Sequence, residues 1–209
     1  DRLRSRGLGD VYKRQIYCDT GAMYRAVTLK AIQSQIELTD ESAVVAMLKQ
    51  TQISFQPGDP VQHVFIDGNE ITEAIRQPKI TNSVSTIASL GGVRAELVNR
   101  QRDIAKQSSI VMDGRDIGTA VLPNAPVKIF LIASVSERAE RRYKENMGKG
   151  IETPLEQLKK EIEIRDHKDS TRKVSPLTKA SDAIEVDTTS MSVEQVVDEI
   201  TKIINEKIK

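Results

Sequence analysis

Aromatic residues and cysteine are scarce in this sequence. Its 209 residues include four tyrosines, three phenylalanines and no tryptophan, so we expect a core of aliphatic side chains. The one cysteine, Cys18, excludes an intrachain disulfide framework, which fits a reducing compartment, and we expect it to be a small buried apolar residue. No apolar run approaches the roughly 20 residues that span a bilayer, and no signal-peptide pattern opens the chain. The sequence therefore predicts a cytoplasmic protein.

A strong net charge is also missing. Lys and Arg number 31 and Asp and Glu number 30, which gives a formal net charge of +1. This balance excludes nucleic-acid binding by bulk positive charge and attachment to membranes by a polybasic surface. The charge is uneven, however, because residues 1–15 hold five basic and two acidic residues, while residues 16–209 carry a net charge of −2.

Composition and apolar patterning predict one α/β domain over residues 16–209. Hydrophobic residues make up 38% of the chain, charged residues 29%, and the mean hydropathy is −0.38, as in globular proteins. Short apolar strands are predicted at 16–18, 110–112, 127–133 and 184–186. From residue 109 onward they alternate with helices, which favours a parallel sheet with helices on both faces.

Residues 40–90 are predicted to form an inserted, smaller α+β subdomain, because the spacing of apolar residues within them changes from helical to alternating. Ile53 and Phe55 alternate with polar residues, and Asp67-Gly68 is a turn signal between short apolar segments. The stretch 52–71 is therefore expected to form an antiparallel sheet.

Helices are predicted around this sheet and between the later strands, at 22–35, 41–51, 78–89, 93–106, 136–147, from 153 onward and at 192–207. Gly91-Gly92 is expected to stop the helix that begins at Pro78. The expected N-terminal caps are Asp40, Ser136, a capping box of Thr153 with Glu156, and a capping box of Ser192 with Gln195.

Charged and small residues gather where predicted strands give way to helices. In the segment Asp-Thr-Gly-Ala-Met-Tyr-Arg at 19–25, backbone N–H groups and the helix dipole favour an anion, to which Arg25 could add a charge. The segment Asp-Gly-Arg-Asp at 113–116 follows a strand and could hold a phosphate, a base edge or a hydrated Mg²⁺. Simpler structural roles stay open: an N-capping Thr20 beside a solvated arginine, and a charged turn with an internal ion pair.

Arginines recur at helical spacing on two consecutive helices. The first helix carries Arg138, Arg141 and Arg142 on one face, and the second ends with Arg165, Asp169 and Arg172 on one face. Together the two faces suggest a clamp for polyphosphate, although each by itself is typical of a solvated surface. Neither histidine has neighbours spaced for metal binding, and the sequence identifies no metal ligand.

Taken together, these segments resemble the bacterial cytidylate kinases, which are nucleoside-monophosphate kinases. The matching stretches are DTGAMYR at 19–25, ITNSVSTIASLGGVR at 80–94, VMDGRDIGTAVLPNAPVKIFLIAS at 111–134, ERAERRYKE at 137–145, IRDHKDSTRKVSPL at 164–177 and AIEVDTTSMSVEQVVDEI at 183–200. They follow the family's order from about Ile16 to the C-terminus. The resemblance implies a P-loop NTPase-like parallel sheet, a monophosphate-binding insert at 40–90 and a helical lid at 146–173 that closes over ATP.

The resemblance also implies an activity, the transfer of the γ-phosphoryl group of ATP, bound to Mg²⁺, to CMP or dCMP. Roles are implied for the matching residues: Ser85, Arg94 and Asp116 on the cytosine edge; Arg25, Arg115 and Arg172 on the acceptor phosphate; Asp169 and Arg165 on the pentose or the closed lid; Thr20 beside the nucleotide; Arg141 and Arg142 toward ATP. Arg115, Arg165 and Arg172 are the expected catalytic residues, because guanidinium groups align polyanions and a phosphate oxygen needs no general base. We expect a monomer that binds neither nucleic acid nor membrane.

A motif that such a kinase requires is missing from the sequence. A P-loop has the pattern Gly-x-x-x-x-Gly-Lys-Ser/Thr between a strand and a helix, and it would precede residue 19. Residues 1–15 offer only Gly7-Leu8-Gly9, with no lysine after the second glycine. We therefore expect residues 1–15 to be a non-native leader. We also expect the 209 residues as written to have negligible kinase activity and reduced stability, because they lack the anchor of the donor phosphates and the central strand.

Two other functions stay open: a CMP-binding protein without phosphoryl transfer, and another nucleoside-monophosphate kinase of the same architecture. The enlarged insert and the set of Ser85, Arg94 and Asp116 argue against the second. A nucleic-acid-binding role conflicts with the charge of −2 outside residues 1–15 and with the few aromatic residues available for stacking.

Overall fold

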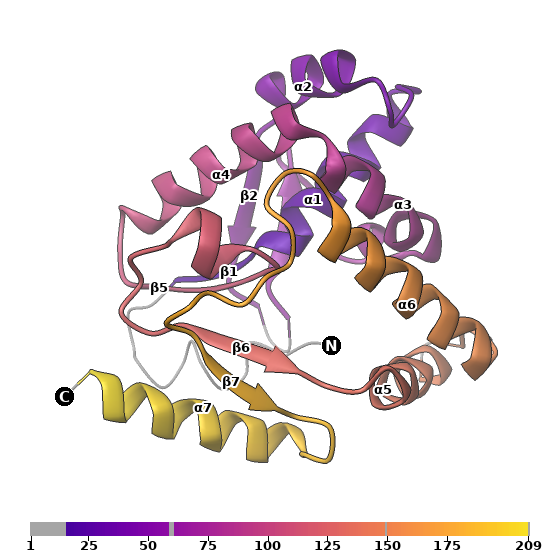
Figure 1. Ribbon diagram of the computed structural model, residues 1–209. Coiled ribbons are helices and arrows are strands. Elements are labelled where there is room, and N and C mark those ends of the chain that lie inside the picture. The colour runs from indigo at the N-terminus through magenta and orange to yellow at the C-terminus, as the bar shows by residue number, and fades with distance from the viewer. Residues whose placement is uncertain (1–15, 59–60, 149, 209) are drawn as a thin grey trace.

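Parallel strand pairs form the centre of the molecule (Figure 1). The computed structural model describes residues 16–58, 61–148 and 150–208, so the expected leader at 1–15 lies outside the described residues. Strand β1 (Ile16–Asp19) pairs in parallel with β5 (Ile110–Asp113), and β6 (Ile129–Ile132) pairs in parallel with β7 (Ile184–Asp187). The predicted α/β class with parallel strands is confirmed, and the strand predicted at 127–133 is shorter than expected.

Helices lie on both sides of these strands (Figure 1). The helices on the side of β1 and β5 are α1 (Thr20–Gln33), α2 (Glu41–Gln50), α3 (Pro78–Ser89) and α4 (Gly91–Ala105), and α7 (Val193–Lys207) lies along β7. The main core is aliphatic, as predicted, and the fully buried Cys18 packs in it with Val27, Leu48 and Leu97. None of the helices within the described ranges is long and apolar enough to cross a bilayer.

Helices α5 (Val135–Met147) and α6 (Leu155–Thr171) pack against each other as a separate pair. They have a small core of their own, formed by Ala139, Leu158 and Ile162. The C-terminal part of the pair returns to the rest of the molecule, where α6 contacts α3. The residues at the end of α6 are therefore placed beside the carboxyl ends of β1 and β5.

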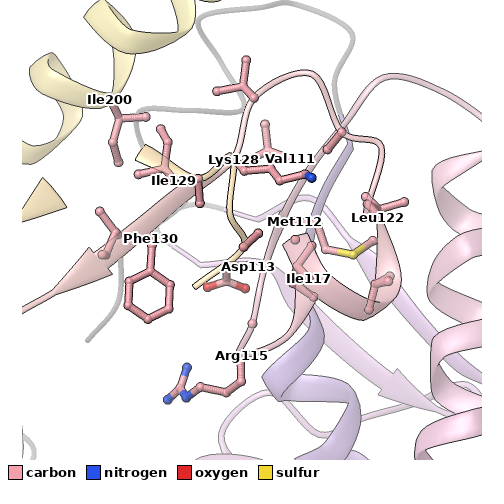
Figure 2. A pocket seen from close by; sticks show the side chains of 18 of the residues that line it. Val111, Met112, Asp113, Arg115, Ile117, Leu122, Lys128, Ile129, Phe130 and Ile200 are labelled. Carbon is pink, nitrogen blue, oxygen red and sulfur yellow. The ribbon is translucent and has the colours of Figure 1, made fainter. Parts of the chain in front are cut away.

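The two strand pairs do not join into one sheet within the described residues. Instead, a cavity of about 1930 Å³ lies between β5 and β6. Figure 2 shows Val111 and Met112 of β5 on one side of it, Phe130 of β6 on another, and Ile200 of α7 nearby. Leu131 of β6 also lines this cavity and is 40% exposed. The continuous sheet that the alternation of strands and helices predicts is thus present as two separate halves.

The antiparallel sheet predicted for 52–71 is confirmed. It consists of β2 (Ile53–Gln56), β3 (His63–Ile66) and β4 (Asn69–Glu70), and the short 3₁₀ helix η1 (Ala74–Arg76) follows. The turn residues Asp67 and Gly68 have φ angles of 49° and 81°, as in the mirror-image turns that match the twist of a hairpin. Ala26 and Leu29 of α1 pack against Val64 and Ile66 of β3, so this sheet shares a core with α1.

Two predicted helix caps are wrong. Ser134, not Ser136, caps α5, because the Ser134 hydroxyl accepts a hydrogen bond from the Glu137 N–H at 3.2 Å. The capping box of Thr153 with Glu156 does not form, since α6 begins after Pro154 and the Glu156 carboxylate instead accepts from Lys159 at 2.8 Å. The Asp40 cap and the capping box of Ser192 with Gln195 are confirmed.

The role predicted for Gly91-Gly92 is also wrong. Helix α3 ends at Ser89, and the two glycines form the first turn of α4. The Gly92 N–H donates to the carboxylate of Glu41, and a Cβ on Gly92 would lie 2.9 Å from that oxygen. The glycines therefore allow α2 and α4 to approach closely.

The position of the α5 cap can be tested by substitution. Ser134→Ala removes the acceptor for the Glu137 N–H and is expected to lower the free energy of unfolding by about 1 kcal/mol. Ser136→Ala is the matched control and is expected to change it by less than about 0.5 kcal/mol. Urea denaturation followed by circular dichroism measures both, and a larger loss for Ser136→Ala would contradict the assignment.

Candidate functional site

A buried ion pair forms the centre of the candidate site. Arg94 of α4 is 2% exposed and Asp116, which follows β5, is 5% exposed; Arg94 Nη2 donates to Asp116 Oδ2. Arg94 Nη1 also donates to the Ala88 carbonyl oxygen at 3.2 Å, and the guanidinium carbon lies 5.5 Å from the centre of the Tyr24 ring. Because a guanidinium this deeply buried is costly without a counter-charge, Asp116 fixes the position of Arg94.

A second buried carboxylate, Asp169 of α6, gathers three further arginines. Arg115 Nε donates to Asp169 Oδ2 at 3.2 Å, and Arg165 Nε lies 3.8 Å from the same oxygen. Arg172 lies between the two carboxylates, with Nη1 3.7 Å from Asp169 Oδ1 and Nη2 3.9 Å from Asp116 Oδ1. One ion-pair network thus links α4, the loop after β5 and the end of α6.

The parallel pairing of β1 with β5 brings the segments 19–25 and 113–116 together. Asp19 and Asp113 are partners at the carboxyl ends of these strands. Thr20 is not the N-cap of α1, because the Asp19 side chain accepts from the Ala22 N–H at 2.9 Å and the Thr20 hydroxyl instead donates to the Asp113 carbonyl oxygen at 2.7 Å. A Cβ on Gly114 would overlap the Thr20 hydroxyl, so this position requires glycine.

A short π-helical turn that the sequence does not predict, η2 (Ile117–Val121), holds the loop after β5 in place. The N–H groups of Thr119, Ala120 and Val121 donate to the Asp116 carbonyl oxygen, and the Ala120 nitrogen lies 2.8 Å from it. The side chain of Arg102 in α4 donates to the Val121 and Ala120 carbonyl oxygens at the other end of the turn. The turn therefore anchors Asp116 to α4, the helix that carries Arg94.

Positive charge is concentrated on the open side of this network. Burial, together with the charges of Arg115, Arg25 and Arg142, lowers the pKa of Arg165 to about 9, although the Asp169 carboxylate opposes this shift. Burial and the charge of Arg94 likewise lower the pKa of Arg172. Arginines that repel one another are stabilised together by a multiply charged anion, such as a nucleotide phosphate.

The other expected site residues lie around this network with different partners. Arg25 Nη1 donates to the Thr81 hydroxyl at 3.4 Å, and Ser85 is half-buried on α3, one turn before Ala88. Arg142 lies 4.0 Å from Glu161. These positions leave Arg25 and Ser85 beside the ion-pair network, on α1 and α3.

Two of the arginines on α5 hold other parts of the protein. Arg141 Nε donates to Glu137 at 2.8 Å and its Nη2 to the Thr188 carbonyl oxygen, which ties α5 to the loop after β7. Arg138 forms a bidentate pair with Asp166 at 2.9 and 2.6 Å, which joins α5 to α6. A role for Arg141 toward ATP stays a prediction.

Sequence reasoning included Asp113 in the segment 113–116 that could hold a phosphate, a base edge or a hydrated Mg²⁺, but it did not predict the electrostatics of its carboxyl group. Desolvation and the Asp19 carboxylate raise the pKa of Asp113 to about 7, against the opposing effects of the hydrogen bond that the Tyr17 hydroxyl donates to Asp113 Oδ2 at 3.2 Å and of the Arg115 charge. Figure 2 shows Asp113 and Arg115 at the edge of the cavity between the strand pairs. The signal in the sequence that could have indicated this carboxylate pair is that the strands β1 and β5 both end in aspartate, at Asp19 and Asp113.

Comparisons with known proteins agree with this geometry. The family described as cytidylate kinase matches residues 6–206. A cytidylate kinase from Pediococcus pentosaceus is 72% identical over 194 residues, which cover 93% of this chain and 86% of the relative. Cytidylate kinases from Lactiplantibacillus plantarum and Enterococcus faecalis are 63% and 58% identical over 192 residues, which cover 92% of this chain and 84% and 85% of the relatives.

The parallel α/β fold and the arginine-rich site at the strand ends define a kinase of the nucleoside-monophosphate class. Within that class, the chain belongs to the cytidylate kinase family. Family membership supports phosphorylation of CMP, with ATP as the phosphate donor. The resemblance stated from the sequence motifs is therefore confirmed.

The dependence of the site on its central ion pair leads to a stability prediction. Asp116→Ala leaves the buried guanidinium of Arg94 without its counter-charge and is expected to lower the free energy of unfolding by about 3–5 kcal/mol. Asp166→Ala, which breaks the more exposed pair with Arg138, serves as control and is expected to cost about 1 kcal/mol or less. Equal losses in urea denaturation would contradict the burial argument.

The raised pKa of Asp113 leads to a pH prediction. The folded state holds the Asp113 proton more tightly than the unfolded chain, so its ionisation lowers stability as pH rises from 3.8 to about 7. Asp113→Asn removes this ionisation, and the stability of the variant relative to the unsubstituted protein is expected to rise across that window and then level off. Urea denaturation at a series of pH values measures the difference, and a difference that does not change with pH would contradict the assignment.

Proposed function

We propose that the ion-pair network binds CMP and dCMP and that, in a complete enzyme of the family, it supports transfer of the γ-phosphoryl group of ATP to them. One observation carries this proposal: two buried carboxylates orient four arginines toward one place at the strand ends. Arginines held in this way are preorganised for phosphate oxygens, which they bind in a bidentate manner. We further propose a cytoplasmic monomer.

The two parts of the network suit the two ends of a nucleoside monophosphate. Arg94 and Asp116 lie deepest, where the carboxylate can accept from an exocyclic amino group and Ser85 can add a hydroxyl. Arg25, Arg115 and Arg172 would bind the acceptor phosphate, and Thr20, at the start of α1, would lie beside the nucleotide. Asp169 and Arg165 couple this region to α6, so closure of the lid at 146–173 would bring them to the pentose.

The chemistry needs positioning rather than a base. An oxygen of the CMP phosphate forms a bond to the γ-phosphorus, the bond from that phosphorus to the bridging oxygen breaks, and its electron pair stays on ADP. Arg115, Arg165 and Arg172 would offset the charge that repels the two polyanions, with Arg142 and Arg141 nearer the donor. Mg²⁺ would arrive on the ATP phosphates, because the described residues gather no three side chains that could hold a metal ion.

We also propose that the 209 residues by themselves bind CMP but turn over negligibly. The printed sequence contains no P-loop pattern to cradle the donor phosphates.

Calorimetry with CMP tests the proposed binding, and a coupled assay of ADP release tests the proposed loss of turnover. We expect CMP to bind, and Arg172→Met to weaken it by about 10- to 100-fold through loss of a charged hydrogen-bond donor. Lys106→Met, at the exposed residue that follows α4, is the control and is expected to leave the affinity for CMP unchanged.

Three results would count against the proposal. Robust ADP release with CMP and ATP would contradict the loss of turnover. Absence of CMP binding would contradict the assigned site. Equal affinity for AMP and CMP would favour another nucleoside-monophosphate kinase specificity.

A further inference from the structure

The hydroxyl group of Tyr24 is buried without a hydrogen-bond partner. Tyr24 lies on α1 and is 8% exposed, and its Oη contacts no donor or acceptor among the described residues. A buried hydroxyl in this state destabilises a protein relative to a phenylalanine of the same shape. The hydroxyl therefore points to a partner that the polypeptide itself does not supply.

Two other unpaired polar atoms belong to the same cluster of residues. Arg94 Nε and Arg172 Nη2 are also buried and have no hydrogen-bond partner within the described ranges. The Tyr24 ring lies beneath the Arg94 guanidinium, and the charges of Arg94, Asp116 and Arg172 all act on the pKa of Tyr24. Three unsatisfied atoms around one ion pair indicate a polar ligand with several hydrogen-bonding positions.

We propose that Tyr24 is a further specificity-determining residue, whose hydroxyl donates a hydrogen bond to the pyrimidine base of the bound nucleotide. This inference rests on the proposed CMP site. Burial raises the pKa of Tyr24 to about 12, so the hydroxyl keeps its proton at neutral pH and can donate it to a ring nitrogen or carbonyl oxygen.

The burial of the surrounding charges places the base, rather than the phosphate, near Tyr24. The side chain of Arg94 is 2% exposed and those of Asp116 and Arg172 are each 6% exposed, whereas that of Arg115 is 45% exposed. Because a doubly charged phosphate needs accessible cations, it is assigned to the side of Arg115, and the uncharged base to the side of Arg94 and Asp116, with Arg172 between them. Tyr24 is therefore aligned with the part of the site that recognises the base.

Tyr24→Phe in the full 209-residue chain tests this proposal, because it removes one oxygen and keeps the ring beneath Arg94. We expect the unfolding temperature without ligand to be unchanged or higher, since an unpaired hydroxyl is lost. Affinity for CMP is expected to fall by about threefold to tenfold, the loss of one hydrogen bond. Affinity for ribose 5-phosphate, which has no base, is expected to stay the same.

Tyr143→Phe on α5 is the matched control, because its side chain is exposed and far along the chain from the site. Tyr143→Phe is expected to change neither the affinity for CMP nor the affinity for ribose 5-phosphate. Unchanged CMP affinity in Tyr24→Phe, or equal loss of CMP and ribose 5-phosphate, would overturn the role of the hydroxyl. If the unsubstituted protein binds no CMP, the proposed function fails instead, so the two failures are distinguishable.

Discussion

The burial of the Arg94 guanidinium is the constraint on which the rest of the site depends. A charge that is 98% removed from solvent requires a counter-charge at close range, and Asp116 supplies it. Asp116 reaches Arg94 only because Gly114 lets the loop after β5 pass against Thr20, and because η2 turns the chain back toward α4. The interaction that fixes the structure at this place is therefore also the deepest part of the proposed binding site.

The second carboxylate extends this constraint to α6, which belongs to the proposed lid. Asp169 is buried at the end of α6, and it shares Arg172 with Asp116 and holds Arg115 from the loop after β5. Arg172 Nε donates to the Ser175 carbonyl oxygen at 2.7 Å, but the separations of 3.7–3.9 Å between its Nη atoms and these carboxylates are longer than hydrogen bonds, so the Nη groups are oriented by charge. A nucleotide that takes up those N–H groups would also secure the position of α6, which couples substrate binding to closure.

Local sequence signals predicted much of this structure. The helix from Pro78 to Ser89, the turn at Asp67-Gly68 and the capping box at Ser192 follow from residues that act on their immediate neighbours. The meeting of the segments after β1 and β5 follows from the rule that parallel strands end at one edge. Features that depend on distant partners were missed: Gly91-Gly92 meets Glu41 of another helix, and Arg141 reaches the carbonyl of Thr188.

The central claim is that the network around Asp116 and Asp169 is the nucleotide site, and a crystal structure of the 209-residue chain with CMP tests it most directly. We expect the base against Asp116 and Arg94, with the phosphate oxygens within hydrogen-bond distance of Arg115 and Arg172. CMP in the cavity between β5 and β6, or bound with its phosphate away from Arg115 and Arg172, would contradict the claim.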